Sequence, residues 1–167
     1  MSCVKSRENI IQLSGDLPTQ GSIAPDFELV NSNLKPRSLQ QYGRKKKLIA
    51  TVPAIDSFIC AQSSRRIAAM AEDNPDTAFM IVSLDLPFTL ARFKKVEKLK
   101  KVDLLSAFRA VDFARHYGVL MQDGVLQGML ARAVLLLSDD NRILYAELVA
   151  DIGHEPDYDA ALAALTA

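Results

Sequence analysis

One cysteine in this sequence stands where a nucleophile would be expected. Cys60 follows residues 51–59, a run that passes from an apolar, strand-like stretch into a helix-like one. A cysteine in the first turn of a helix faces unpaired backbone N–H groups and the positive end of the helix dipole, and both favour the thiolate over the thiol. Because the thiolate is the nucleophilic form, the position of Cys60 predicts a reactive sulfur.

Two residues just before the cysteine fit the same interpretation. Pro53 is expected to fix the turn that leaves the strand. The hydroxyl of Ser57 comes three residues before Cys60, near enough in a turn-to-helix geometry to bond the thiolate or an oxygen of an incoming substrate. A cysteine without such neighbours is usually a small core hydrophobe. The spacing Pro-x-x-x-Ser-x-x-Cys therefore favours chemistry over packing.

Length and charge narrow the classes of function. The 167 residues fit one domain covering residues 1–167. With 20 basic and 20 acidic residues the net charge is zero, so no overall field would draw the chain to nucleic acid or an anionic membrane. Apolar runs such as residues 133–137 are too short to span a bilayer, and residues 1–8 lack the apolar core of a secretory signal. We therefore expect a cytoplasmic protein.

The cysteines and histidines give no sign of a metal site. Only Cys3 and Cys60 occur, which is no disulfide framework and suits a reducing compartment. The two histidines, His116 and His154, lie far apart, and no Cys/His spacing of a structural zinc site is present. We expect neither a metal nor another cofactor.

The elements that must position these residues can be read from hydrophobic patterning. Three nearly continuous apolar runs are typical of strands covered on both faces, at residues 47–52, 78–84 and 133–138. Helical patterns fall between and after them, at residues 61–71, 111–117 and 157–165.

Turn signals complete the predicted fold. Residues 139–142 form a hairpin turn, so the last two strands should be antiparallel. Residues 10–13, followed by turn residues 14–18, indicate the first part of an N-terminal hairpin. The sequence therefore predicts an α/β protein: a thioredoxin-like mixed sheet flanked by helices, with an N-terminal β-hairpin.

Several stretches beyond the cysteine run carry a family resemblance, namely 21–27, 83–88, 91–93, 117–119 with Phe113, 131–134 and 155–158. With them the chain resembles the bacterial thiol peroxidases, a subgroup of the peroxiredoxins, over nearly its whole length. The resemblance implies that Cys60 attacks hydrogen peroxide or an organic hydroperoxide, that Ser57 and Arg132 hold and polarise it, and that Pro53 shields the site. It also implies a homodimer recycled by thioredoxin. The charge of Arg132 supports its predicted role independently of the resemblance, because a guanidinium beside the sulfur stabilises a thiolate.

The sequence departs from that family at two positions. Most thiol peroxidases carry a resolving cysteine directly after the Arg-Phe pair that matches residues 92–93, and here Lys94 follows. A sulfenic acid on Cys60 must then be reduced by an outside thiol, such as thioredoxin, glutathione or a glutaredoxin, or by Cys3. The second departure is Phe58, where the family often has glycine, and its ring could narrow the mouth of the pocket.

Two alternatives stay open at this point. Loss of the resolving cysteine also fits a peroxide-sensing module that forms the sulfenate and passes the oxidation to a partner protein. Arg65, on the helix behind Cys60, is either a second cation near the thiolate or, as is commoner, a surface arginine.

Overall fold

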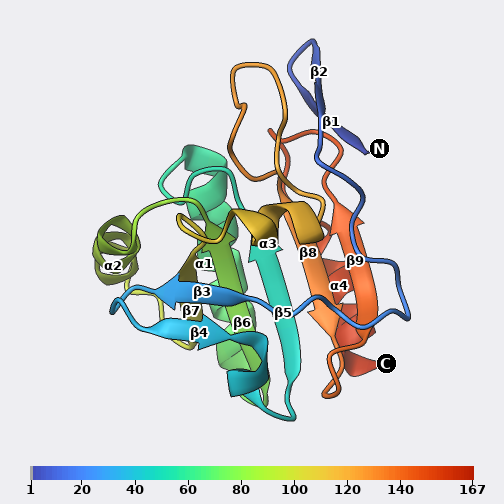
Figure 1. Cartoon of the computed structure of the whole chain (residues 1–167). Coiled ribbons are helices and arrows are strands. Elements are labelled where there is room, and N and C mark those ends of the chain that lie inside the picture. The colour runs from blue at the N-terminus through green and yellow to red at the C-terminus, as the bar shows by residue number, and fades with distance from the viewer. Residues whose placement is uncertain (1) are drawn as a thin grey trace.

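A seven-stranded mixed sheet with helices on both faces organises the protein (Figure 1). The computed structural model describes residues 2–167. The strands are β1 (Cys3–Ser6), β2 (Asn9–Gln12), β3 (Glu28–Asn31), β4 (Pro36–Ser38), β5 (Lys46–Thr51), β6 (Thr77–Ser83), β7 (Val102–Ser106), β8 (Ala133–Leu137) and β9 (Ile143–Leu148). The helices are α1 (Phe58–Asp73), α2 (Pro87–Val96), α3 (Val111–His116), α4 (Tyr158–Thr166) and the 3-10 helix η1 (Leu39–Tyr42).

The order of strands in the sheet is β4-β3-β7-β6-β5-β8-β9. β6 lies between β5 and β7 and is parallel to both, whereas β8 and β9 continue the sheet antiparallel. β1 and β2 pair with each other as a separate antiparallel hairpin. The predicted fold class, a thioredoxin-like mixed sheet with an N-terminal hairpin, is confirmed.

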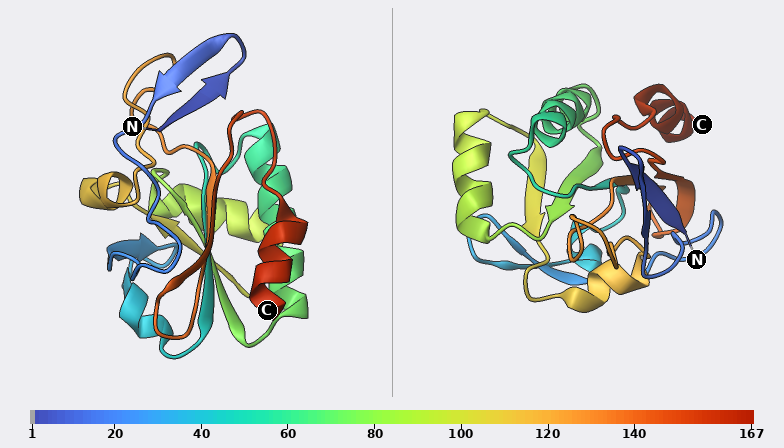
Figure 2. Two further views of the ribbon diagram at one scale, coloured as in Figure 1. Left: turned by 90° about the vertical axis from the view of Figure 1, so that its right-hand side faces the viewer. Right: turned by 90° about the horizontal axis from the view of Figure 1, so that it is seen from above.

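The sheet is buried on both faces, which is why its central strands are apolar throughout. In β5, Leu48 and Ala50 pack into the core beneath α1, α2 and α4, while Ile49 between them packs into the core on the α3 side. Successive side chains of a strand point to opposite faces, so both sets must be apolar here. Figure 2, seen from above, shows α1 and α4 on one side of the sheet and α3 on the other.

Three details differ from the sequence predictions. Residues 10–12 belong to the second strand of the N-terminal hairpin and Leu13 follows it, because the turn comes earlier, at Arg7, whose φ is 55°. Helix α1 begins at Phe58 rather than at residue 61, since Ser57 caps it. Helix α2 and strand β7 were not predicted. A polar Asp103, which accepts a hydrogen bond from a tyrosine hydroxyl, breaks the apolar run of β7.

In residues 2–167 no helix is both long and apolar enough to cross a membrane.

Gly118 fixes how the loop between α3 and β8 leaves the helix. Its φ is +67°, and a Cβ at this position would lie 2.2 Å from the carbonyl oxygen of Asp16. Only glycine fits, because a side chain would meet both an unfavourable backbone conformation and a backbone atom that cannot move aside. The close approach holds this loop, which ends at Arg132, against the N-terminal segment.

Replacing Gly118 with alanine should therefore lower the free energy of unfolding by roughly 2 to 5 kcal/mol, the sum of the positive-φ cost and of overpacking. Gly128→Ala is the matched control, because its φ is +86° but nothing lies within 4 Å of the added Cβ. The control should lose only about 1 to 2 kcal/mol. Urea unfolding of the two variants measures the difference, and equal losses would contradict the packing argument.

Candidate active site

Helix α1 places Cys60 in its first turn. The Ser57 hydroxyl oxygen caps the helix by accepting a hydrogen bond from the Cys60 backbone N–H, with N and O 3.4 Å apart. The oxygen is thus engaged in capping, while the hydroxyl proton is still available to donate. Cys60 is 0% exposed. The predicted position of the cysteine at a helix N-terminus is confirmed.

A buried guanidinium contacts the sulfur. Arg132, only 2% exposed, places Nη2 3.4 Å from Cys60 Sγ and 3.4 Å from the carbonyl oxygen of Ile152. Its Nη1 lies 3.5 Å from the Ser63 hydroxyl. The remaining donor, Nε, is buried without a hydrogen-bond partner in residues 2–167. Buried donors are rarely left unpaired, so Nε has the capacity to bind one further acceptor.

The backbone on either side of Arg132 is fixed by Thr51, the last residue of β5. Its buried hydroxyl donates to the carbonyl of Ala131 at 2.7 Å and accepts from the N–H of Ala133 at 3.1 Å. One side chain therefore clamps both neighbours of the arginine. Thr51 was not predicted from the sequence, although a single hydroxyl at the end of an apolar strand could have indicated a polar role.

A polar network around Tyr158, the first residue of α4, lies near the arginine. The Tyr158 hydroxyl donates to one Glu155 carboxylate oxygen at 2.7 Å, and the Gln62 side chain of α1 donates to the other at 2.8 Å. Burial raises the pKa of Tyr158, while a hydrogen bond with Ser63 and the charge of Arg132 act in the opposite direction. Ser63, which accepts from Arg132 Nη1, therefore lies near both the tyrosine and the guanidinium. In the sequence, residues 155–158 stood out only as part of the family resemblance, and no role was predicted for them.

The predicted residues surround one cavity of about 560 Å³, which we call the Cys60 cavity. Pro53, Ser57 and Arg132 line it. Ser57 and Arg132 also contact Cys60, which therefore lies next to the cavity without lining it. Phe58, 79% exposed, stands at the edge. Most of the remaining lining is apolar, from Ala54, Ile59, Leu126, Met129 and Ile152.

The N-terminal hairpin overhangs this cavity. Two backbone hydrogen bonds join Lys5 to the loop after β9, from Lys5 N–H to the Ala150 carbonyl at 2.7 Å and from Ile152 N–H to the Lys5 carbonyl at 3.0 Å. Ser6 and Arg7 thereby reach the cavity wall. Figure 2 shows the hairpin tip extending above the space between α1 and α4.

Three other residues singled out from the sequence lie away from the sulfur. Arg65 forms an ion pair at 3.0 Å with Glu97, the residue that follows α2, which assigns Arg65 to the helix surface. Lys94 is half-buried, and its Nζ donates to the Val102 carbonyl at 2.7 Å, so it ties α2 to β7. Cys3 is exposed on β1, and both it and Cys60 are free thiols.

Comparisons with known proteins agree on one family. The Redoxin family model matches residues 19–162. The thiol peroxidase of Leptospira interrogans (strain Fiocruz L1-130) is 35% identical over 100% of this chain and 99% of its own length. Among solved structures, a thiol peroxidase from Chromobacterium violaceum has a TM-score of 0.92 at 27% identity, covering 98% of this chain and 95% of its own. A peroxiredoxin-like protein from Aquifex aeolicus also reaches 0.92, at 29% identity and 99% and 96% coverage.

Because Thr51 satisfies two buried backbone groups, Thr51→Val should destabilise the protein by about 1 to 3 kcal/mol despite its similar shape. It should also slow alkylation of Cys60, since Arg132 loses its fixed position. Thr166→Val is the control: its exposed hydroxyl should matter by less than about 0.5 kcal/mol. Chemical unfolding and iodoacetamide labelling of a Cys3→Ser background measure both effects. A fully stable Thr51→Val protein would rule out the clamp.

Proposed function

The chain belongs to the redoxin family and is a thiol peroxidase of the peroxiredoxin type, and from this premise we propose that Cys60 is the residue that attacks the peroxide. The observation that carries the proposal is the contact of 3.4 Å between Cys60 Sγ and the buried guanidinium of Arg132. A cation at this distance favours the thiolate and can bind the oxygens of a hydroperoxide.

The proposed reaction is a displacement at oxygen. The Cys60 thiolate attacks the terminal oxygen of the hydroperoxide, so an S–O bond forms as the O–O bond breaks. Negative charge passes to the leaving oxygen, which takes up a proton and departs as water or an alcohol. The unpartnered Nε of Arg132 and the free hydroxyl proton of Ser57 are the donors that stabilise this charge. Cys60 is left as a sulfenic acid, and no metal or organic cofactor takes part.

The size and lining of the Cys60 cavity suit peroxides of different sizes. At about 560 Å³ it is much larger than hydrogen peroxide requires, since a water molecule takes up roughly 30 Å³ of liquid. Its apolar lining suits a hydroperoxide with an organic group, and Phe58 stands where it would contact that group. Pro53 covers the reacting atoms on the loop side. We therefore propose hydrogen peroxide and organic hydroperoxides as substrates.

Recycling of the sulfenic acid is proposed to use an external thiol. Lys94 stands at the position of the usual resolving cysteine, and its side chain is engaged with β7. Thioredoxin, or a smaller thiol such as glutathione, would supply the electrons. As in relatives of this subgroup, we propose a homodimer. Repeated turnover of peroxide with at least one of these reductants tests the enzyme, whereas consumption of one equivalent followed by a stop would instead indicate a peroxide sensor.

Arg132 and Ser57 can be tested by paired substitutions. Arg132→Lys keeps the charge but loses the planar set of donors, so oxidation of Cys60 by peroxide should slow by about tenfold or more. Ser57→Thr should be nearly silent, because it keeps the hydroxyl, whereas Ser57→Val should be impaired. Stopped-flow oxidation kinetics compare the three. Unaltered rates in both Arg132→Lys and Ser57→Val would show that these roles are wrongly assigned.

Lys94 allows the recycling step to be rebuilt. In the unmodified protein, one equivalent of peroxide should leave a sulfenic acid that dimedone traps, with no internal disulfide in nonreducing mass analysis. Lys94→Cys should form a disulfide with Cys60 and raise turnover with thioredoxin. Lys94→Ser, which also loses the bond to Val102 but adds no thiol, is the control. A Cys3–Cys60 disulfide in the unmodified protein would make Cys3 the resolving residue.

A further inference from the structure

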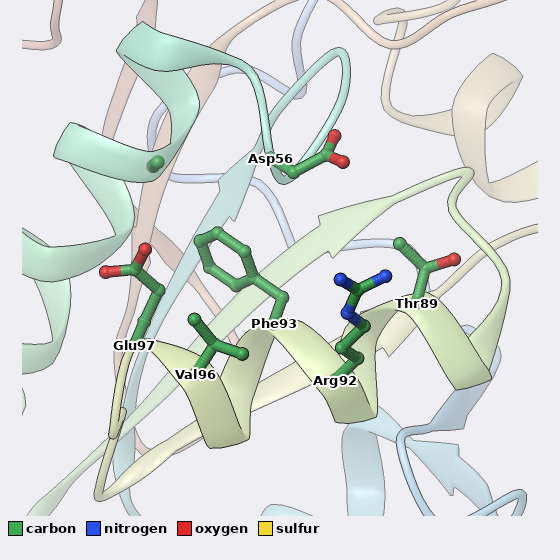
Figure 3. A pocket seen from close by; sticks show the side chains of 7 residues that line it. Asp56, Thr89, Arg92, Phe93, Val96 and Glu97 are labelled. Carbon is green, nitrogen blue, oxygen red and sulfur yellow. The ribbon is translucent and has the colours of Figure 1, made fainter.

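A second cavity, of about 320 Å³, lies between α1 and α2, and we call it the α2 cavity (Figure 3). Asp56 and Ala61 line it from the α1 side, whereas residues 57–59 line the Cys60 cavity. The first turn of α1, which carries Cys60, therefore separates the two cavities. The volume is at the lower end of the range of small-molecule sites, about 300 to 1,000 Å³.

The α2 cavity offers two unengaged charges of opposite sign. The Arg92 guanidinium and the Asp56 carboxylate both line it, and neither has a hydrogen-bond or ion-pair partner in residues 2–167. In Figure 3 the Arg92 side chain rises from α2 toward the loop that holds Asp56, and the Phe93 ring lies between them and Glu97. Glu97 is already neutralised by Arg65. One free cation and one free anion thus stand beside an apolar surface.

We propose that the α2 cavity binds the external thiol that reduces the oxidised Cys60, and that this thiol is a small molecule with an amino-acid head group. Arg92 pairs with the carboxylate of the thiol, Asp56 pairs with its ammonium group, and the carbon bearing the sulfur packs on Phe93. The inference rests on the proposed function, because it identifies the class of reductant for the same sulfur.

The position of the cavity suits this step. Ala61, part of its wall, is the residue next to Cys60 in the chain. On the other wall, Arg92 and Phe93 directly precede Lys94, the position at which the sequence resemblance expects a resolving thiol. A thiol bound in this cavity would lie beside the turn that carries Cys60, whereas the Lys94 side chain points away from the cavity, to the Val102 carbonyl.

Access to the sulfur requires the first turn of α1 to open, because Cys60 is fully buried. The capping bond from Cys60 N–H to Ser57 is 3.4 Å long, beyond the usual 2.7 to 3.2 Å for such bonds, whereas the backbone bond from Ala61 N–H to the Ser57 carbonyl is 2.8 Å long. Opening the turn therefore breaks one normal helical hydrogen bond and one weak capping bond. The bound thiol then attacks the Cys60 sulfur: an S–S bond forms, the S–O bond breaks, and hydroxide leaves as water with the proton of the thiol. A second thiol attacks the mixed disulfide, releasing the Cys60 thiolate and the symmetrical disulfide.

Rates of reduction test the two charges separately. Preformed sulfenic acid in a Cys3→Ser background is reduced with cysteine, 3-mercaptopropionate, cysteamine or 2-mercaptoethanol. Each thiol is compared with itself across variants, so differences in intrinsic reactivity cancel. Arg92→Gln should slow the two carboxylate-bearing thiols by about fivefold, and Asp56→Asn should slow the two ammonium-bearing ones similarly. Neither variant should affect 2-mercaptoethanol by more than about twofold. Arg115→Gln, an exposed arginine on α3, is the matched control.

Binding can be measured without any chemistry at sulfur. S-methylcysteine, which cannot reduce the enzyme, is titrated into reduced Cys60→Ser protein while amide NMR shifts are followed. Shifts should concentrate at Ala61, Thr89 and Val96 and disappear with Arg92→Gln. Shifts confined to the Cys60 cavity, at Met129 and Ile152, would overturn the inference, and so would the absence of shifts.

The two experiments separate the inference from the function on which it rests. If peroxide fails to oxidise Cys60, the proposed function is wrong, and the titration alone decides whether the cavity binds the head group. If Cys60 is oxidised and recycled but Arg92→Gln and Asp56→Asn leave every thiol unaffected, the function stands and the α2 cavity is not the thiol site.

Discussion

The structure depends on a guanidinium buried beside a sulfur. A buried charge is costly unless it is paired, and Arg132 bonds to a carbonyl, a hydroxyl and Cys60, with no carboxylate in direct contact within the described residues. Hydrogen bonds to these groups offset part of the cost of burying the charge, and an anionic group beside Arg132 would offset more of it. Under the proposed mechanism, this site would be organised to bind developing negative charge before the substrate arrives.

The sheet order makes that contact possible. β5 and β8 are neighbours and pair Thr51 with Ala133, so the end of one strand lies beside the start of the other. The loop leaving β5 leads to the first turn of α1, and Arg132 immediately precedes β8. Sulfur and guanidinium, 72 positions apart in the chain, meet because the two strands are adjacent.

Patterns carried by side chains along a single segment could be predicted from the sequence. The apolar runs of β5, β6 and β8 and the cysteine at the start of α1 are of this kind. The carbonyl of Ile152 leaves no trace in the sequence, because every residue has one, and the clamp by Thr51 depends on a strand 80 positions away. Strand β7 was not predicted because Asp103 interrupts its apolar pattern. The carboxylate of Asp103 accepts a hydrogen bond from a tyrosine that is distant in the sequence. The features that could not be predicted from the sequence are therefore those that depend on tertiary contacts.

The attachment of the N-terminal hairpin has a practical consequence for handling this protein. Ile152 is held to Lys5 through its N–H and to Arg132 through its carbonyl, so a single peptide segment connects the first strand of the chain to the arginine that contacts Cys60. An affinity tag fused at the N-terminus, or trimming of the first few residues during purification, would act close to that segment. The C-terminal end of α4 lies at the opposite end of the molecule (Figure 1) and is the safer place for a fusion or for immobilisation on a sensor surface.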